Sequence, residues 1–247
     1  MNRLDQVLVE RGLCESREKA KRAVMAGLVR INGHPARKPS DAIKPEDLLS
    51  LDAAEPFVSR GGLKLAHALD HFQLDVAGQS CVDLGASTGG FTDCLLQHGA
   101  ARIYAVDVGQ GQLAWKLRND PRVVVMEKTN ARTLTPSSFP APFTAVDLVV
   151  IDCSFISLRK LLSVAIALLR PSGRIVALIK PQFEAGKAEA DKGEGVITDP
   201  AVHQRVLREL EQYVADLTGV AWRGVTESPL TGPAGNKEFL VLLEKNR

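Results

Sequence analysis

One segment constrains the fold of this chain more than any other: residues 82–92, with the sequence VDLGASTGGFT. Its apolar start predicts a strand that ends beside Asp83, and the glycines at 85, 89 and 90 then lead into a helix. A parallel strand that turns through glycines into a helix commonly forms a pocket for a nucleotide-type cofactor. The next predicted strand ends at Asp107, where a carboxylate can accept hydrogen bonds from ribose hydroxyls.

The glycine spacing indicates which cofactor this pocket suits. Dinucleotide sites follow G-x-G-x-x-G, whereas residues 85–90 read G-x-x-x-G-G, so a pyrophosphate is disfavoured. Glycines let the backbone approach a flat, uncharged group closely, and Asp83 suits a cationic amino-acid group. S-adenosylmethionine has both properties and is the expected cofactor; the alternative is that Gly89 and Gly90 only form a tight turn. The predicted cofactor-binding residues are Asp83, Gly85, Ser87, Gly89, Gly90, Phe91, Asp107 and Val108.

Composition and charge suggest two domains. The chain has 247 residues, 45% hydrophobic and 24% charged, which is typical of a globular protein with a core domain and a smaller appendage. The formal charge of +2 is unevenly distributed, because residues 1–40 contain nine Lys or Arg and four Asp or Glu. This basic end predicts a module that binds a polyanion; the alternative is a solvated charged face.

The cysteines and the hydropathy pattern indicate in which cellular compartment the protein is expected. Four scattered cysteines with no C-x-x-C pair predict free thiols of a cytoplasmic protein rather than a zinc site or a disulfide framework. Residues 1–13 lack the apolar core of a signal peptide. The longest apolar stretch, residues 161–169, is far shorter than the roughly 20 residues that span a bilayer. We therefore expect neither secretion by a signal peptide nor a membrane partner.

The first 52 residues predict a small α+β domain. Residues 4–12 carry apolar side chains at helical spacing, and Ser16 can cap a second helix with a strongly basic side. Residues 29–31 run into Asn32-Gly33, a dipeptide that favours a type I′ hairpin turn, and residues 48–51 supply a further strand.

These segments resemble the S4-type RNA-binding domain, named after a protein of the small ribosomal subunit. The resemblance covers residues 2–52 through the motifs Arg3-Leu4-Asp5, Ser16-Arg17-Glu18-Lys19-Ala20 and Gly27-Leu28-Val29-Arg30-Ile31-Asn32-Gly33. It implies that the basic helix and the hairpin follow folded RNA through its phosphates. The domain contains no aromatic residue, so recognition of RNA shape is favoured over base stacking. The predicted RNA-binding residues are Arg3, Arg17, Lys21, Arg22 and Arg30.

The rest of the chain alternates strands with helix-length segments, which predicts an α/β fold with a doubly wound parallel sheet. The expected strands lie near 80–84, 102–108, 122–126, 146–152 and 173–180. A final antiparallel pair near 220–226 and 238–243 fits a methyltransferase better than a dehydrogenase. We predict an RNA-binding domain at 1–52, a linker at 53–62, and a Rossmann-like class I methyltransferase domain at 63–247.

Four charged residues are expected at one rim of this sheet. Asp152 and Lys180 end two strands, Lys64 precedes the first helix of the domain, and Glu238 opens the last strand. Individually each is more simply a surface lysine or a salt-bridged acid, but ligands of such sheets lie beyond the carboxyl ends of the strands. A ribose 2′-hydroxyl needs a base before it attacks a methyl donor. We assign Lys180 as general base, Lys64 as the second cation that favours its neutral form, and the two acids as their supports.

This arrangement resembles the Lys-Asp-Lys-Glu tetrad of the FtsJ-like ribose 2′-O-methyltransferases, and nearly the whole chain is similar to the TlyA family. The motifs are Ser59-Arg60-Gly61-Gly62-x-Lys64-Leu65, the glycine segment through Asp93, Asp107-Val108-Gly109, Asp152-x-Ser154-Phe155-Ile156-Ser157 and Ile179-Lys180-Pro181-Gln182-Phe183-Glu184. The resemblance implies methylation of cytidine 2′-hydroxyls in ribosomal RNA within assembled subunits. The chain starts two residues before Arg3, as in the shorter type that acts on the large subunit. The family's old haemolysin label has no support in an export or spanning segment.

Other functions remain open on the sequence. Cys153 could serve as the nucleophile of a pyrimidine C5-methyltransferase, although Asp152 rather than Pro precedes it. Base N-methylation is disfavoured because residues 152–155 read DCSF rather than an Asn or Asp followed by prolines. A catalytically inactive RNA-binding factor of ribosome assembly is the non-enzymatic alternative.

Two further features have ordinary alternatives. His67 and His71 are four residues apart, but without a third ligand a partly buried pair is favoured, and we expect no metal. Residues 186–195 follow Lys180 and are either a lid that RNA orders or a mobile loop.

Overall fold

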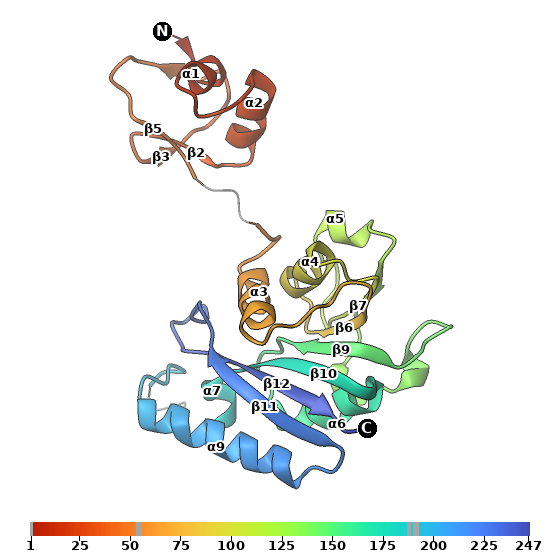
Figure 1. The fold of residues 1–247 in the computed structure, drawn as a ribbon. Coiled ribbons are helices and arrows are strands. Elements are labelled where there is room, and N and C mark those ends of the chain that lie inside the picture. The colour runs from red at the N-terminus through yellow and green to blue at the C-terminus, as the bar shows by residue number, and fades with distance from the viewer. Residues whose placement is uncertain (1, 53–55, 187–188, 190–192) are drawn as a thin grey trace. The chain divides into compact units, whose positions relative to one another are not determined.

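The computed structural model describes residues 2–52, 56–186, 189 and 193–247, and its contacts divide the chain into two compact units, Met1–Glu55 and Pro56–Arg247 (Figure 1). The first unit has two helices and short strand pairs. Its elements are β1 (Asn2–Arg3), α1 (Leu4–Glu10), α2 (Arg17–Met25), β2 (Val29–Ile31), β3 (His34–Pro35), β4 (Ala42–Ile43) and β5 (Leu49–Leu51). β2 pairs with β3 and β5, β1 pairs with β4, and the two helices enclose a core with Val29 and Ile43.

Local sequence signals of the first unit are confirmed. The Ser16 side chain accepts a hydrogen bond from the Lys19 N–H and caps α2. Asn32 and Gly33 have φ angles of 52° and 82°, the positive values that a type I′ turn requires at both central positions. The hairpin therefore turns where the sequence predicted it.

The second unit is built on a seven-stranded sheet, in the order β11-β12-β10-β9-β6-β7-β8. Five adjacent strands, β10, β9, β6, β7 and β8, run parallel to one another. β12 is antiparallel to both of its neighbours, β10 and β11. The bounds are β6 (Ser80–Leu84), β7 (Arg102–Val106), β8 (Val123–Met126), β9 (Val146–Ile151), β10 (Leu169–Ile179), β11 (Val220–Glu227) and β12 (Phe239–Lys245). This confirms the predicted α/β class and the antiparallel pair at one edge.

Helices cover both faces of this sheet because its strands are apolar on both sides. α3 (Gly61–His71) and α4 (Gly90–Gln97) pack with one face, and α6 (Arg159–Leu168) and α9 (Pro200–Asp216) pack with the other (Figure 1). Two short helices, α5 (Trp115–Arg118) and α7 (Pro181–Glu184), lie close to the strand ends. The carboxyl ends of β6, β7, β9 and β10 thus remain available for a site.

Residues 56–62 belong to the second unit rather than to the predicted linker at 53–62, of which residues 53–55 lie outside the described part. The Phe57 side chain is buried against Gly62, where an added Cβ would lie 2.3 Å from the ring. The Val58 N–H donates to the Asp93 carboxylate at 2.8 Å, and the Gln97 amide donates to the Pro56 carbonyl. These contacts bind the segment to α4, and α3 already begins at Gly61.

Within the described ranges, no helix has the length and apolar character needed to cross a membrane.

Candidate active site

Three adjoining pockets open where the parallel strands end. The first, of about 300 Å³, and the second, of about 590 Å³, share Gly85, Ser87, Asp152 and Ser154 in their walls. A third, of about 330 Å³, shares Ser154, Lys180 and Glu238 with the first. We call these the central, the acidic and the aromatic pocket, after the residues described below.

The four predicted catalytic residues all line the central pocket. Lys64 Nζ lies 2.5 Å from Glu238 Oε2, although the two residues are 174 positions apart in the sequence. Lys180 Nζ lies 2.6 Å from Asp152 Oδ1. The site therefore contains two lysine–carboxylate pairs side by side in one pocket, with Lys64, Lys180 and Glu238 almost completely buried.

Secondary structure determines where each of these side chains stands. Asp152 follows β9, Lys180 follows β10 and precedes the proline that begins α7, and Glu238 immediately precedes β12. Lys64 lies in the first turns of α3. The Lys180 ammonium also donates to Ser154 Oγ at 2.9 Å, a contact from a residue that was not among the predicted catalytic set. Ser154 could have been found from its place in the motif that follows Asp152.

The glycine segment is held in a shape that only glycine tolerates at two positions. Gly85 has a φ of 89°, and an added Cβ would lie 2.7 Å from the Asp152 carbonyl oxygen. Gly89 has a φ of 95°, and its Cβ would lie 2.2 Å from the Leu117 side chain. Positive φ angles of this size are strained for any residue with a side chain. At these two positions the turn into α4 packs closely against Asp152 and Leu117, and the approach of a cofactor to the glycines stays a prediction.

The acidic pocket contains the predicted ribose-binding acid. The Asp107 carboxylate follows β7 and accepts hydrogen bonds from the Ser87 N–H at 2.8 Å and the Gly109 N–H at 2.7 Å. These bonds fix the carboxylate at the pocket wall, and each oxygen retains a lone pair for a ligand hydroxyl. The neighbouring Val108 is 76% exposed and offers an apolar surface in the same pocket.

Asp83, Gly89 and Phe91 lie differently from the other predicted cofactor residues. The Asp83 side chain is fully buried beneath the turn, accepts a hydrogen bond from Thr92 Oγ1 at 2.7 Å, and lines none of the three pockets named above. Its burial raises the pKa to about 7. Gly89 is also absent from the walls, whereas Phe91 and Gly90 line the central pocket. The Asp83 carboxylate thus supports the turn through Thr92, and its role toward a cationic ligand stays a prediction.

Two aromatic side chains flank the aromatic pocket. Phe155 is 91% exposed and has a φ of 63°, and its ring centroid lies 5.3 Å from that of Phe183. A positive φ is unusual for a bulky residue and is maintained only when its surroundings enforce it. Here Glu184 accepts hydrogen bonds from Ser157 Oγ and the Leu158 N–H, which ties the segment after Asp152 to α7. Neither aromatic was predicted as a site residue.

Cys153 is not placed as a nucleophile. Its thiol donates to the Leu84 carbonyl at 3.3 Å, and burial raises its pKa to about 12. A thiolate attacks, whereas a neutral thiol does so poorly. This geometry disfavours the C5-methyltransferase alternative.

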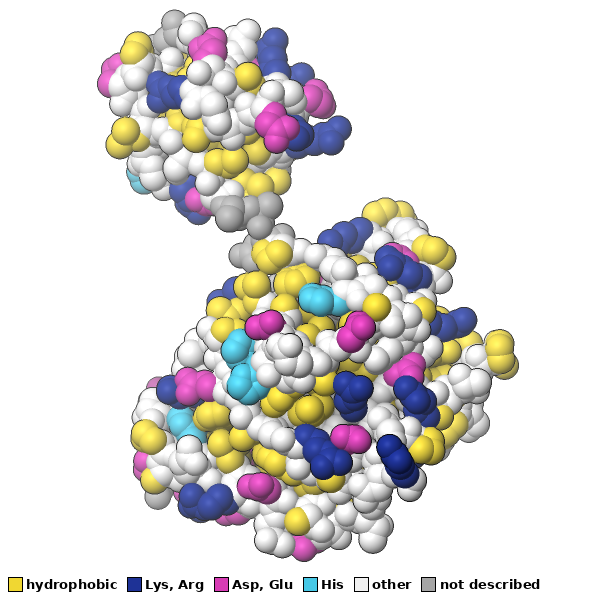
Figure 2. Space-filling view, viewed as in Figure 1, with side chains coloured by type: hydrophobic (Ala, Val, Ile, Leu, Met, Phe, Trp, Pro, Cys, Tyr) yellow, Lys and Arg dark blue, Asp and Glu magenta, His cyan; other side chains and the backbone are white. Residues whose placement is uncertain are grey.

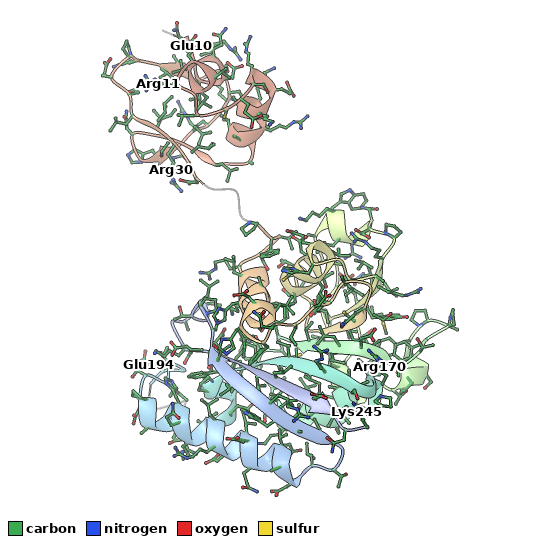
Figure 3. The ribbon with its side chains drawn as sticks, viewed as in Figure 1. Glu10, Arg11, Arg30, Arg170, Glu194 and Lys245 are labelled. Atoms are coloured by element: carbon green, nitrogen blue, oxygen red, sulfur yellow. The ribbon has the colours of Figure 1, made fainter. Side chains whose placement is uncertain are left out.

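The predicted RNA-binding residues lie at the surface of the first unit, where basic and acidic side chains alternate (Figure 2). Arg3 and Arg17 both bond to Asp5, and Lys21 lies 3.8 Å from Glu18. The Arg30 guanidinium on β2 pairs at 2.8 Å with Asp52, which directly follows β5. Glu10 is the last residue of α1, and Arg11 follows it (Figure 3). Arg22 is exposed, and its side chain has no ionic or hydrogen-bond partner among the described residues.

The histidine pair and the predicted loop give no further site. His67 and His71 stack at 5.9 Å, and His67 also contacts Thr226 Oγ1. In the ranges that the structure covers, no group of three or more His, Cys, Asp or Glu is arranged to hold a metal. Of the loop 186–195, residues 187–188 and 190–192 lie outside the described part, so the proposed lid remains a prediction. The remaining segment, Gly193 to Ile197, is bonded to Asn236, which donates to the Gly195 carbonyl and accepts from the Ile197 N–H.

The pocket walls suit S-adenosylmethionine. Asp107 and Val108 offer an acid for ribose hydroxyls and an apolar face for a base. The central pocket adjoins this one at Gly85, Ser87, Asp152 and Ser154, which line both. A ligand that fills both would lie across the turn with its middle beside Asp152.

Two protein families and several curated relatives match this chain. The FtsJ-like methyltransferase family matches residues 57–245, and the S4 domain family matches residues 2–49. A Bacillus subtilis protein provisionally named rRNA methyltransferase YqxC is 51% identical over 98% of this chain and 85% of its own length. TlyA of Mycobacterium tuberculosis, named a 16S/23S rRNA (cytidine-2′-O)-methyltransferase, is 48% identical over 98% of this chain and 89% of its own.

A solved structure agrees with these relatives. A Streptococcus thermophilus protein provisionally named a hemolysin superposes with a TM-score of 0.76 and 44% identity, covering 99% of this chain and 88% of its own. The hemolysin name thus occurs among proteins with the same two units.

Proposed function

Because the chain belongs to the FtsJ-like methyltransferases, and within them to the TlyA family with its S4 domain, we propose that it methylates a cytidine ribose 2′-hydroxyl of ribosomal RNA. S-adenosylmethionine is the proposed donor and assembled ribosomal subunits, the large subunit above all, are the proposed substrate, in the cytoplasm. The observation that carries the proposal is the convergence of Lys64, Asp152, Lys180 and Glu238 on one pocket.

The chemistry divides between the donor and the chain's own residues. When bound, S-adenosylmethionine supplies a methyl group on a sulfonium, so that a new O–C bond forms as an S–C bond breaks. The proposed base is the neutral amine of Lys180, after its ammonium has lost a proton: its lone pair accepts the proton of the 2′-hydroxyl, and its Nζ lies beside Asp152 and Ser154 at the junction of the central and aromatic pockets. Lys64, held by Glu238, orients the same hydroxyl from the other side of the pocket. Positioning of the two reacting groups provides the remaining acceleration.

The aromatic pocket is the proposed place of the target nucleobase. Phe155 is exposed at its wall beside Phe183, and a flat base stacks favourably on such rings. Because this pocket meets the central one at Lys180, a base there brings its own ribose toward the lysine. This supports 2′-O-methylation over methylation of the base.

The test uses purified protein, labelled S-adenosylmethionine, and unmodified large and small ribosomal subunits, with the modified nucleoside identified by mass. We expect 2′-O-methylcytidine, and a fall in kcat of about 10²- to 10⁴-fold for Lys180→Ala, the usual range for loss of a general base. Lys237→Ala is the matched control, because that exposed lysine pairs only with Glu227 outside the pockets.

Three other outcomes would each exclude part of the proposal. A base-methylated product would overturn the 2′-hydroxyl as acceptor. Full activity of Lys180→Ala would overturn the role of that lysine. Binding of S-adenosylmethionine and RNA without any transfer would favour the inactive assembly factor.

A further inference from the structure

A buried acid stands beneath two of the exposed arginines of the first unit. Asp5 lies in the first turn of α1 and is fully buried, with a relative accessibility of 0%. Its Oδ1 accepts from Arg3 Nε at 3.0 Å, and its Oδ2 accepts from Arg3 Nη2 at 3.2 Å and from Arg17 Nε at 3.0 Å. One carboxylate thus joins a residue of β1 to the first residue of α2.

The two guanidinium groups remain accessible although the acid is not. The side chains of Arg3 and Arg17 are 45% and 50% exposed. Arg17 uses only Nε, so both of its terminal nitrogens keep their N–H groups, and Arg3 keeps those of Nη1. The hydrogen bonds from the two arginines hold the pKa of Asp5 below its usual range, so the carboxylate stays ionised. Two cations and one buried anion leave a net positive charge at the surface.

The other ion pairs of this unit are of a different kind. Lys19 pairs with Glu15, Lys21 lies near Glu18, and Arg30 pairs with Asp52, whose side chain is 40% exposed. Solvent-exposed pairs of this type are weak and exchange readily. Within residues 2–52, Asp5 is the acid that is both fully buried and bonded to two arginines.

We propose that Asp5 is a positioning residue that sets Arg3 and Arg17 as a preformed clamp for one phosphate of the RNA backbone. Arginine forks match the geometry of phosphate oxygens, and a free arginine loses much rotamer freedom when it binds. In this unit that ordering takes place during folding, because the shared carboxylate already fixes both side chains. The inference deepens the proposed function, on which it rests for the RNA ligand.

The test separates positioning from net charge. Full-length wild type, Asp5→Asn and Glu18→Gln are compared for binding to a fluorescein-labelled RNA stem-loop and to the ribosomal RNA of unmodified, assembled large subunits, the proposed substrate. Both variants gain one positive charge, so simple electrostatic attraction predicts equal or tighter binding for both. A clamp that depends on Asp5 predicts that only Asp5→Asn weakens binding, by about fivefold to tenfold, because a neutral amide with one acceptor oxygen cannot hold two guanidinium groups.

A second variant, Arg17→Lys, keeps the proposal testable if Asp5→Asn does not fold. Arg17→Lys keeps the charge but lacks the planar fork, so we expect weaker binding with an unchanged dependence on salt. Thermal unfolding is measured for every variant, and if Asp5→Asn does not fold, Arg17→Lys decides the question. Equal binding by Asp5→Asn and Glu18→Gln, or by Arg17→Lys and wild type, overturns the clamp. Failure of the wild type to bind either RNA overturns the proposed RNA substrate as well, which distinguishes the two ideas.

Discussion

Asp83, a predicted cofactor residue, has a fully buried carboxylate. Its carboxylate is buried under the glycine turn and receives only the Thr92 hydroxyl as a side-chain donor. Removal from water disfavours the ionised form, so burial raises the pKa to about 7. The folded protein therefore holds this proton more tightly than the unfolded chain does.

This difference predicts a pH dependence of stability. Since the folded-state pKa of Asp83 is above the unfolded one, its contribution is fully present below about pH 4 and is lost as the pH rises toward 7. We expect wild type to lose on the order of 2 kcal/mol of unfolding free energy between pH 5 and pH 7 from this group. Asp83→Asn removes the titration and flattens the profile, as urea unfolding at several pH values will show.

Asp70→Asn is the matched control for this prediction, because Asp70 is exposed on α3. Its profile should follow that of wild type. If Asp83→Asn shows the same slope as Asp70→Asn, burial of Asp83 does not control the titration.

At the scale of single residues, the sequence located the acids and lysines but not their partners. Asp107, Asp152 and Lys180 could be predicted because each directly follows a strand with a clear apolar pattern. The pairing of Lys64 with Glu238 depends on the sheet as a whole, and no local pattern specifies it. The burial of Asp83 likewise depends on the helix that covers it.

Among the elements, the segment Gly193 to Ile197 and the loop before β12 form one wall of the aromatic pocket. Asn236 is buried and bonds both to the Gly195 carbonyl and to the Ile197 N–H, each at 2.9 Å. His203 on α9 also contacts the Ile197 carbonyl at 2.9 Å. Glu194, labelled in Figure 3, belongs to this segment. The wall is therefore fixed by His203 and by Asn236, which lies two residues before Glu238.

We expect Asn236→Ala to lower kcat and raise the KM for ribosomal subunits, while the KM for S-adenosylmethionine changes less than about twofold. The substitution removes the partner of the buried Ile197 N–H and of the Gly195 carbonyl, which belongs to an exposed residue. The unpaired Ile197 N–H costs roughly 1–3 kcal/mol of stability, and the change loosens the aromatic pocket but not the acidic one. Asn119→Ala is the control, because Asn119 is exposed and bonds only to the Trp115 carbonyl. Equal kinetics of the two variants, or a large change in the KM for S-adenosylmethionine, would contradict this role.

Strands with a long hydrophobic pattern were predicted correctly, but the predicted ends of two strands differ from the observed ends because of local backbone geometry. β7 ends at Val106 rather than at 108, because the Asp107 carboxylate turns to accept two backbone N–H groups. β10 starts at Leu169 instead of 173, because a break in register between Leu169 and Arg174 lets the strand continue past Pro171. Such irregularities depend on the neighbouring strand and leave little trace in the sequence.

For the whole molecule, the boundary between the units can be tested with two fragments. We expect residues 56–247 to unfold cooperatively and to bind S-adenosylmethionine, because Phe57 and Val58 pack onto α3 and α4. Residues 63–247, the fragment that the sequence suggested, lack these contacts as well as Ser59, Arg60 and Gly61 of the central pocket. Burial of one aromatic side chain contributes about 2–3 kcal/mol, so the shorter fragment should melt on the order of 5–10 °C lower.

Differential scanning calorimetry measures the melting temperature of each fragment, and calorimetric titration measures its affinity for S-adenosylmethionine. Equal melting temperatures and equal affinities of the two fragments would show that residues 56–62 are dispensable, as a linker would be.

The ion pair between Lys64 and Glu238 forms only late in the synthesis of the chain, so the site is completed late as well. Lys64 stands in the first helix of the second unit, whereas Glu238 precedes β12, which inserts between β10 and β11 only after both have been synthesised. A nascent chain that is still missing this strand has a glycine turn and three of the four charged groups but no completed centre. On the proposed function, we therefore expect chains truncated before β12 to lack methyl transfer even when most of the sheet has formed, because Glu238 and its pairing with Lys64 are missing.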